Sequence, residues 1–278
     1  MKHREGTFTG VRKATIYCQD WSPEGEARAA LVVVHGLAEH CGRYGNLVDH
    51  FVSRGYAVYA HDHVGHGRSS GQRVFVEQFE DLTDVLGMHV DRVRDRHPEK
   101  PLFLVGHSLG ALIAARFLLD RQEAFAGAIL SGALVKVPDN ISPTTVLLSR
   151  LLSFVVPRIG LVAVDAHGVS RDPAVVQAYI DDPLVYTGKT TACMGAEILK
   201  AMQRTLGEAG RITLPLLILH GSEDRLADPD GSRILHETAG SADKTLRIYD
   251  GLHHEIYNEP EHALVLGDVQ AWLEEREG

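Results

Sequence analysis

Residues 102–110 read LFLVGHSLG, and this stretch decides the fold. A short apolar run from Leu102 to Val105 ends in the pattern G-x-S-x-G, and residues 111–119 (ALIAARFLL) then contain good helix formers with no breaker. A strand, a sharp turn and a helix are the context that a nucleophile elbow requires. Such a turn holds its serine in a strained backbone conformation, and the flanking glycines lack the Cβ atoms that would collide with neighbouring elements. We therefore predict that Ser108 is a nucleophile.

Runs of strand length alternate with helix-forming segments along most of the chain. Continuous apolar runs are typical of strands that are buried on both faces of a parallel sheet. Their alternation with helices predicts right-handed crossover connections, and two alternating runs between residues 5 and 21 predict an antiparallel start. The expected fold class is therefore α/β, with a mostly parallel sheet and helices on both of its faces. Besides residues 102–105, the expected parallel strands are 29–35, 56–61, 127–131, 216–219 and 245–249.

Residues 135–200 interrupt this rhythm. They contain five prolines and helical fragments in place of a strand–helix alternation. We expect them to be an excursion from the sheet that lies above its carboxyl edge. The predicted organisation is an α/β core formed by residues 1–134 and 201–278, with residues 135–200 inserted as a cap or lid.

The composition limits the partners and the location of the protein. A net charge of −9 argues against a nucleic-acid partner, because phosphate binding needs a positive surface. The three cysteines are far apart and show neither disulfide nor zinc-site spacing. Residues 1–10 (MKHREGTFTG) lack the apolar core of a secretory signal, and no segment has the apolar length of a membrane span. We therefore expect a cytoplasmic protein.

A serine hydroxyl becomes a good nucleophile only when a base, itself oriented by a third group, removes its proton. In a fold of this class the acid and the base follow later strands, in the order serine, acid, histidine. A gap of several residues after the strand favours Asp224 as the acid, whereas the residues alone do not separate the two candidate histidines. The candidates are Glu223, Asp224 and Asp228 after the strand at 216–219, and His253 and His254 after the strand at 245–249.

Cleavage of an acyl bond also needs hydrogen-bond donors for the negative charge that develops on the carbonyl oxygen. In this class of fold one donor is the backbone N–H of the residue after the nucleophile, which is Leu109. The second comes from the loop after the strand that ends at His35, where we expect the N–H of Leu37.

Six segments carry a resemblance to a known family, and together they span nearly the whole chain, including the predicted cap. They resemble the monoacylglycerol lipase (monoglyceride lipase) family of α/β-hydrolases. The segments are HGLAEHCGRY at 35–44, AHDHVGHGRSSG at 60–71, GHSLGA at 106–111, SRDPAVVQAYIDDPLV at 170–185, LHGSEDRLADPDGS at 219–232 and YDGLHHEIYNEPE at 249–261.

The resemblance implies a sheet of about eight strands and a catalytic triad of Ser108, Asp224 and His254, with Leu37 and Leu109 as the oxyanion donors. It implies hydrolysis of monoacylglycerol to glycerol and a free fatty acid through an acyl-enzyme, with no cofactor. The family often has Met and Gly where this chain has Leu109 and Ala111, a conservative departure that concerns packing behind the turn.

The resemblance also places Glu39, Arg43 and Tyr257 near the alcohol end of the substrate. The alternative is that Glu39 and Arg43 pair with each other or orient the oxyanion loop. Two alternatives to the function remain: a general carboxylesterase or lysophospholipase with the same triad, and a catalytically silent α/β-hydrolase that serves as a receptor.

Two loop motifs resemble other kinds of site. His61, His63 and His66 suggest metal ligands, but a zinc site needs three or four converging ligands, and we predict no metal. Residues 65–71 contain G-x-G-x-x-x-G with no helix start, so the dinucleotide-binding fingerprint fails.

Residues 146–156 (VLLSRLLSFVV) are strongly apolar but too short to span a bilayer. One interpretation is a cap helix that buries its apolar side over the core. The other, favoured by the resemblance, is a lid that makes transient contact with a lipid surface.

Overall fold

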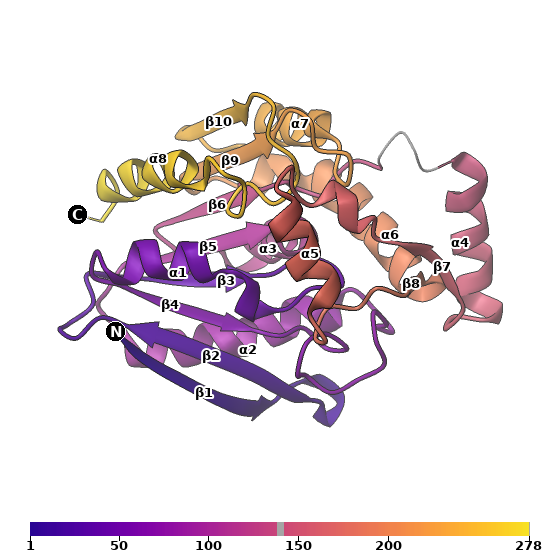
Figure 1. Ribbon diagram of the computed structural model, residues 1–278, viewed down its shortest axis with the longest axis horizontal. Helices are drawn as coiled ribbons and strands as arrows, with labels where there is room; N and C mark the ends of the chain where they lie inside the picture. The colour runs from indigo at the N-terminus through magenta and orange to yellow at the C-terminus, as the bar shows by residue number, and fades with distance from the viewer. Residues whose placement is uncertain (138–141, 278) are drawn as a thin grey trace.

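A computed structural model of the protein describes residues 1–137 and 142–277. Its centre is an eight-stranded sheet that lies between two layers of helices (Figure 1). A second sheet has two strands. The strands of the large sheet are β1 (Lys2–Thr9), β2 (Thr15–Ser22), β3 (Ala29–Val34), β4 (Tyr56–His61), β5 (Leu102–His107), β6 (Gly127–Ser131), β9 (Leu216–Gly221) and β10 (Lys244–Tyr249), and those of the small sheet are β7 (Gly160–Ala163) and β8 (Lys189–Thr191).

The large sheet has the strand order β1-β2-β4-β3-β5-β6-β9-β10. All pairs from β4 to β10 are parallel, whereas β2 pairs antiparallel with both β1 and β4. Every residue of β3, β4, β5 and β6 is buried, as the continuous apolar runs predict for strands covered on both faces. The predicted α/β fold is confirmed.

Side chains of β3 show how the two helical layers share the sheet. Leu31 and Val33 pack with one layer, and Val32 and Val34 pack with the other, because successive side chains of a strand point to opposite faces. The first layer is formed by α1 (Gly45–Val52) and α8 (His262–Glu274) (Figure 1). The second layer contains α2 (Glu80–Arg96), α3 (Leu109–Arg121), α6 (Ala192–Glu208) and α7 (Pro229–Thr238).

The segment between β6 and α6 leaves the sheet, as the irregular sequence predicts. It contains α4 (Pro143–Val155), which stands away from the large sheet, β7, α5 (Pro173–Asp181) and β8 (Figure 1). The two short strands and the long helix α6 are not predicted from the sequence. The expected cap end at residue 200 lies inside α6, which packs against α3. The division into a core of 1–134 and 201–278 and a cap of 135–200 stays a prediction, and residues 138–141 of that cap lie outside the described residues.

The turn between β5 and α3 has the strain that the sequence pattern predicts. Ser108 has φ +55° and ψ −119°, a conformation that L-residues rarely adopt. A Cβ atom on Gly110 would lie 2.0 Å from the carbonyl oxygen of Val34, and one on Gly106 would lie 2.6 Å from the carbonyl oxygen of Gly110. Both positions therefore require glycine, and the hydroxyl of Ser108 is carried at the end of the central strand.

Replacing Gly110 by alanine will destabilise the fold by about 1–3 kcal/mol or more, because the added methyl group overlaps the backbone of β3. The matched control is Gly267→Ala in α8, where nothing lies within 4 Å of the added Cβ. There alanine will raise the free energy of unfolding by up to about 1 kcal/mol through its higher helix propensity. Urea unfolding measures both, and equal stability of Gly110→Ala and the parent would contradict the close approach.

Candidate active site

The structure brings the predicted serine, acid and base to one edge of the sheet. Ser108 lies between β5 and α3, Asp224 follows β9, and His254 follows β10. These positions are the carboxyl ends of parallel strands, where ligands of open α/β sheets bind. Ser108 and His254 line the same cavity.

Asp224 is the acid that contacts His254. Its Oδ2 accepts a hydrogen bond from His254 Nδ1 at 2.6 Å, and its Oδ1 accepts the backbone N–H groups of Leu226 at 2.8 Å and Ala227 at 3.0 Å. Burial alone would raise the pKa of Asp224, but the charge and hydrogen bond of His254, with a hydrogen bond from His220, hold it well below its ordinary value. Asp224 therefore stays ionised.

The alternative candidates lie elsewhere. Glu223 is exposed. Asp228 caps α7 by accepting the N–H of Asp230 at 2.9 Å, and it pairs with Lys136. His253 is half-buried, and its backbone N–H donates to Glu259 at 3.3 Å.

His254 is held in one tautomer by Asp224. Because Nδ1–H donates to the carboxylate, Nε2 is the nitrogen that can take a proton. Burial lowers the pKa of His254, but the charge and hydrogen bond of Asp224, with smaller effects of Glu255 and Glu39, raise it above the ordinary value. A histidine whose pKa is raised and whose ring is held by a buried carboxylate can accept a proton from a hydroxyl near neutral pH.

His107 is a site residue that the sequence interpretation missed. Its ring centroid lies 4.6 Å from that of His254, and its Nδ1 lies 3.1 Å from the hydroxyl of Ser131. Burial, and then the proximity of His254, lower the pKa of His107 well below its ordinary value, so the ring stays neutral. Its position directly before Ser108 in G-x-S-x-G is the signal that could have found it.

The two expected oxyanion donors lie beside Ser108. Leu109 is the first residue of α3, and N–H groups in the first turn of a helix lack intrahelical acceptors. Leu37 and Gly36 follow β3 and line the cavity, and a Cβ on Gly36 would lie 3.2 Å from Cβ of Ser108. Their roles stay predictions.

Glu39 holds the loop that contains Leu37. Its Oε1 accepts the N–H of Gly36 at 2.6 Å and the hydroxyl of Tyr44 at 2.8 Å. Its Oε2 lies 3.3 Å from Nε of Arg43. The alternative that Glu39 and Arg43 pair and orient the oxyanion loop therefore agrees with the geometry, while Glu39 also lines the cavity.

A buried ion cluster surrounds this carboxylate. Arg43 Nη2 donates to both oxygens of Glu255 at 2.7 and 2.6 Å, and the guanidinium lies 4.6 Å from the ring centroid of Tyr179 on α5. Burial, and then the charge of Glu255, raise the pKa of Glu39 against the opposing charge of Arg43. The cluster holds two carboxylates and one guanidinium.

Arg43 and Tyr257 do not belong to the described lining of the cavity. Tyr257 is buried, with its ring centroid 6.4 Å from that of His107. Direct substrate contact by these two side chains stays a prediction.

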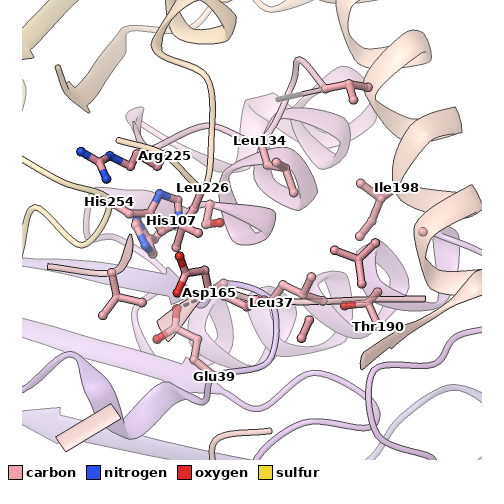
Figure 2. Close-up of a pocket in the computed structure, with 18 of the residues that line it drawn as sticks. Leu37, Glu39, His107, Leu134, Asp165, Thr190, Ile198, Arg225, Leu226 and His254 are labelled. Atoms are coloured by element: carbon pink, nitrogen blue, oxygen red, sulfur yellow. Dashed lines mark hydrogen bonds between the residues drawn. The ribbon is translucent and has the colours of Figure 1, made fainter. Parts of the chain in front are cut away.

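The cavity itself has a volume of about 280 Å³ and is mostly apolar. Leu134 and Ile198 lie on one side of it, and Glu39, His107 and His254 lie at the other end (Figure 2). Such an arrangement of an apolar chamber with a few convergent polar groups is typical of small-molecule sites. The apolar lining includes Leu134, Val137, Val146, Leu161, Ile198, Leu199 and Met202.

The histidines near β4 form a packed cluster. His63 N–H donates to His35 Nε2 at 3.0 Å, and His63 Nε2 donates to the carbonyl of His35 at 2.9 Å. The rings of His61 and His89 lie 4.9 Å apart. Within residues 1–137 and 142–277, no three His, Cys, Asp or Glu side chains are arranged to hold a metal ion. Residues 65–71 lie in the loop before α2, which begins only at Glu80.

The fold and the serine elbow define the class of the protein: it is an α/β-hydrolase. The model for the family described as "Serine aminopeptidase, S33" matches residues 25–261. The chain is 38% identical over 269 residues to a monoacylglycerol lipase of Mycolicibacterium smegmatis, covering 97% of this chain and 96% of that protein. It is 39% identical over 264 residues to a monoglyceride lipase of Rattus norvegicus, covering 94% of this chain and 87% of that protein.

A solved structure agrees with these relatives. The crystal structure of Paleococcus ferrophilus monoacylglycerol lipase is 32% identical and has a TM-score of 0.85, covering 93% of this chain and 98% of that chain. The chain therefore belongs to the Serine aminopeptidase, S33 family and, within it, to the monoacylglycerol lipase family of serine ester hydrolases.

The buried histidine cluster predicts acid sensitivity. Burial lowers the pKa of His89 to about 3, whereas an unfolded histidine titrates near about 6.5. The unfolded chain therefore binds the additional proton, and the contribution of His89 to stability is complete above pH 6.5 and decreases as the pH falls toward 3. The slope is up to about 1.4 kcal/mol per pH unit for this one residue.

We expect His89→Leu to make the pH dependence of stability less steep between pH 6.5 and 4.5, measured by urea unfolding. His3→Gln, at an exposed position, is the control and should leave the slope unchanged. Identical slopes in the parent and in His89→Leu would show that the buried ring does not oppose protonation.

Proposed function

We propose that this serine ester hydrolase cleaves monoacylglycerol to glycerol and a free fatty acid through an acyl-enzyme. The observation that carries the proposal is the position of Ser108, which lies on a strained turn at the polar end of an apolar cavity. His254, supported by Asp224, lines the same end. The names of the relatives supply the substrate class.

In the proposed mechanism, Oγ of Ser108 attacks the ester carbonyl while Nε2 of His254 takes its proton. The carbonyl oxygen becomes an oxyanion, which the N–H groups of Leu37 and Leu109 stabilise by about 2.7–4 kcal/mol each in the transition state. The imidazolium of His254 then protonates the leaving glycerol oxygen. Asp224 keeps the imidazole in the required tautomer and stabilises its charge.

A water molecule completes the reaction. It attacks the acyl-enzyme carbonyl while His254 takes its proton, and His254 then returns that proton to Oγ of Ser108 as the Ser108–acyl bond breaks and the fatty acid is released. No step requires a cofactor.

The cavity suggests how the substrate is oriented. The apolar lining, which comes from α6 and the segment between β6 and α6, would hold the acyl chain. The opposite end offers carboxylates at Glu39 and Glu255 as acceptors for glycerol hydroxyls. Arg43 neutralises part of their charge and keeps both in place. Tyr257, whose ring centroid lies 6.4 Å from that of His107, is the further candidate for contact with the glycerol end.

Ser108→Ala will abolish hydrolysis, with a fall in kcat of at least about 10⁴-fold, and will remove labelling by a fluorophosphonate. Asp224→Asn will lower kcat by about 10⁴-fold, because the amide favours the wrong tautomer of His254.

Rates on mono-, di- and triacylglycerol that carry the same acyl chain measure the substrate class. The parent should prefer monoacylglycerol.

Three outcomes would contradict this assignment in different ways. Equal rates on triacylglycerol would exclude a monoacylglycerol lipase. Equal rates on lysophosphatidylcholine or on simple p-nitrophenyl esters would favour a lysophospholipase or a general carboxylesterase. Failure of the parent to react with the fluorophosphonate would favour the non-catalytic receptor.

The cap would supply contact with a lipid surface. Leu147, Leu151, Phe154 and Val155 of α4 are exposed, Phe154 by 82%. Among the helices of the described residues, none combines the length and apolar character needed to cross a bilayer. We propose that this apolar side of α4 binds reversibly at the interface where the substrate resides. A cytoplasmic location is proposed with it and agrees with the three free thiols.

Phe154→Asp will weaken binding to phosphatidylcholine vesicles by about 10-fold or more, because one large exposed side chain is lost from the interface. Its rate on soluble p-nitrophenyl butyrate should remain that of the parent. Leu264→Asp is the matched control, since Leu264 is 61% exposed on α8, outside the segment that contains α4. Vesicle sedimentation measures both, and equal loss in the two variants would contradict a specific role of α4.

A further inference from the structure

A second imidazole contacts the same carboxylate oxygen as His254. His220, near the end of β9, places its Nε2 at 2.9 Å from Oδ2 of Asp224. Its Nδ1 lies 2.7 Å from the hydroxyl of Ser232 on α7. His220 and Ser232 are both completely buried. The proposed mechanism gives neither residue a role.

The partners of His220 place a proton on its Nε2. Nε2 lies near two oxygens that can only accept, the carboxylate of Asp224 and the carbonyl of Ala227 at 3.2 Å. Nε2 must therefore carry a proton, and Nδ1 forms a hydrogen bond with the hydroxyl of Ser232. His220 is thus a hydrogen-bond donor to Asp224 whose own orientation is fixed by Ser232 on α7.

Asp224 consequently accepts hydrogen bonds from four donors. Its Oδ1 is bound by two backbone N–H groups, and its Oδ2 is shared by the two imidazoles. The backbone donors come from the residues after Asp224 in the same loop, whereas His220 approaches from β9. His220 is therefore the only side chain besides His254 that restrains this carboxylate among the described contacts of Asp224.

We infer that His220 is a positioning residue for the ester hydrolysis: its Nε2–H fixes the rotamer of Asp224 and limits how strongly the carboxylate acts on His254. This inference rests on the proposed function of Asp224 and His254. The Nε2–H of His220 withdraws part of the negative charge of Oδ2. The carboxylate then attracts the proton on His254 less strongly, so that His254 can release this proton to the leaving group. A base that bound its proton too tightly would be protonated before the reaction begins.

The other ionisable groups near the pair come from several elements. His107 at the end of β5, Glu39 after β3 and Glu255 beside His254 face the base. Asp228 at the start of α7 faces His220. They are unchanged when only residue 220 is varied, so a difference between variants at this position reports on the His220–Asp224 bond.

The test compares His220→Leu with His220→Gln. Leucine removes the donor, whereas the glutamine amide keeps an N–H in reach of Asp224. We expect His220→Leu to lower kcat/KM for p-nitrophenyl butyrate by about 10- to 100-fold, the usual effect of losing a hydrogen bond to a charged group. The midpoint of the acid limb of its pH profile should shift to higher pH by about 0.5–1 unit, because the full charge of Asp224 then acts on His254. His220→Gln should restore the position of the limb and most of the rate.

A purely structural role would lower the rate without moving the limb. The inference is overturned if the limb of a folded His220→Leu stays in place, or if His220→Gln behaves like His220→Leu. If His220→Leu does not fold, Ser232→Ala replaces it: removing the hydroxyl loosens the ring of His220, and we expect a smaller upward move of the limb. An unmoved limb in that variant overturns the inference equally.

A second measurement separates this inference from the proposed function. Titration of His254, followed by NMR of its ring nitrogens, needs no turnover. A parent that hydrolyses no ester contradicts the proposed function. The titration midpoint of His254 still tests the role of His220: a higher midpoint in His220→Leu than in the parent supports this role, and an equal midpoint overturns it.

Discussion

The strained backbone of Ser108 is the constraint on which the rest of the site depends. A non-glycine residue at φ +55° costs about 1–3 kcal/mol and persists only when its surroundings leave no alternative. The N–H of Ser108 donates to Ser131 of β6 at 2.9 Å, and its carbonyl accepts the N–H groups of Ala111 at 3.0 Å and Leu134 at 3.3 Å. Gly110 packs directly against the end of β3. Three neighbouring strands and one helix thus hold the turn, so the position of the hydroxyl depends on the register of the central sheet.

The electrostatics of the site follow from the burial of its charged groups. Asp224 is satisfied by internal donors, and the cluster of Glu39, Arg43 and Glu255 leaves one carboxylate in excess of its guanidinium. Buried carboxylates near His254 favour its protonated form, which is the form that arises when the hydroxyl of Ser108 loses its proton. The same charges would oppose the oxyanion of the proposed mechanism. In the proposed mechanism, backbone N–H groups at the start of α3 and after β3 offset this repulsion by donating to the oxyanion.

The segment between β6 and α6 is hydrogen-bonded to two loops of the site, the loop after β3 and the loop after β10 that contains His254. The backbone N–H of Tyr186 donates to the carbonyl of Ala38 at 2.8 Å, and His40 Nε2 lies 2.9 Å from Asp182. On the opposite side, the N–H of Glu255 donates to the carbonyl of Val169 at 2.8 Å. A displacement of this segment would therefore strain the oxyanion loop and the His254 loop together. These hydrogen bonds fix the segment between β6 and α6 relative to both loops.

The strands, the elbow and the order of serine, acid and histidine could be predicted because each depends on a short stretch of sequence. These stretches are an apolar run, G-x-S-x-G, or a loop after a strand. The small sheet could not, since strands of three or four residues show no period, and the predicted cap boundary at residue 200 divided the helix α6. His220 shows the limit most clearly. It directly follows the predicted strand at 216–219, yet the chain turns back within four residues and places Asp224 against its ring. A contact made by such a turn depends on the path of the loop, which no local pattern specifies.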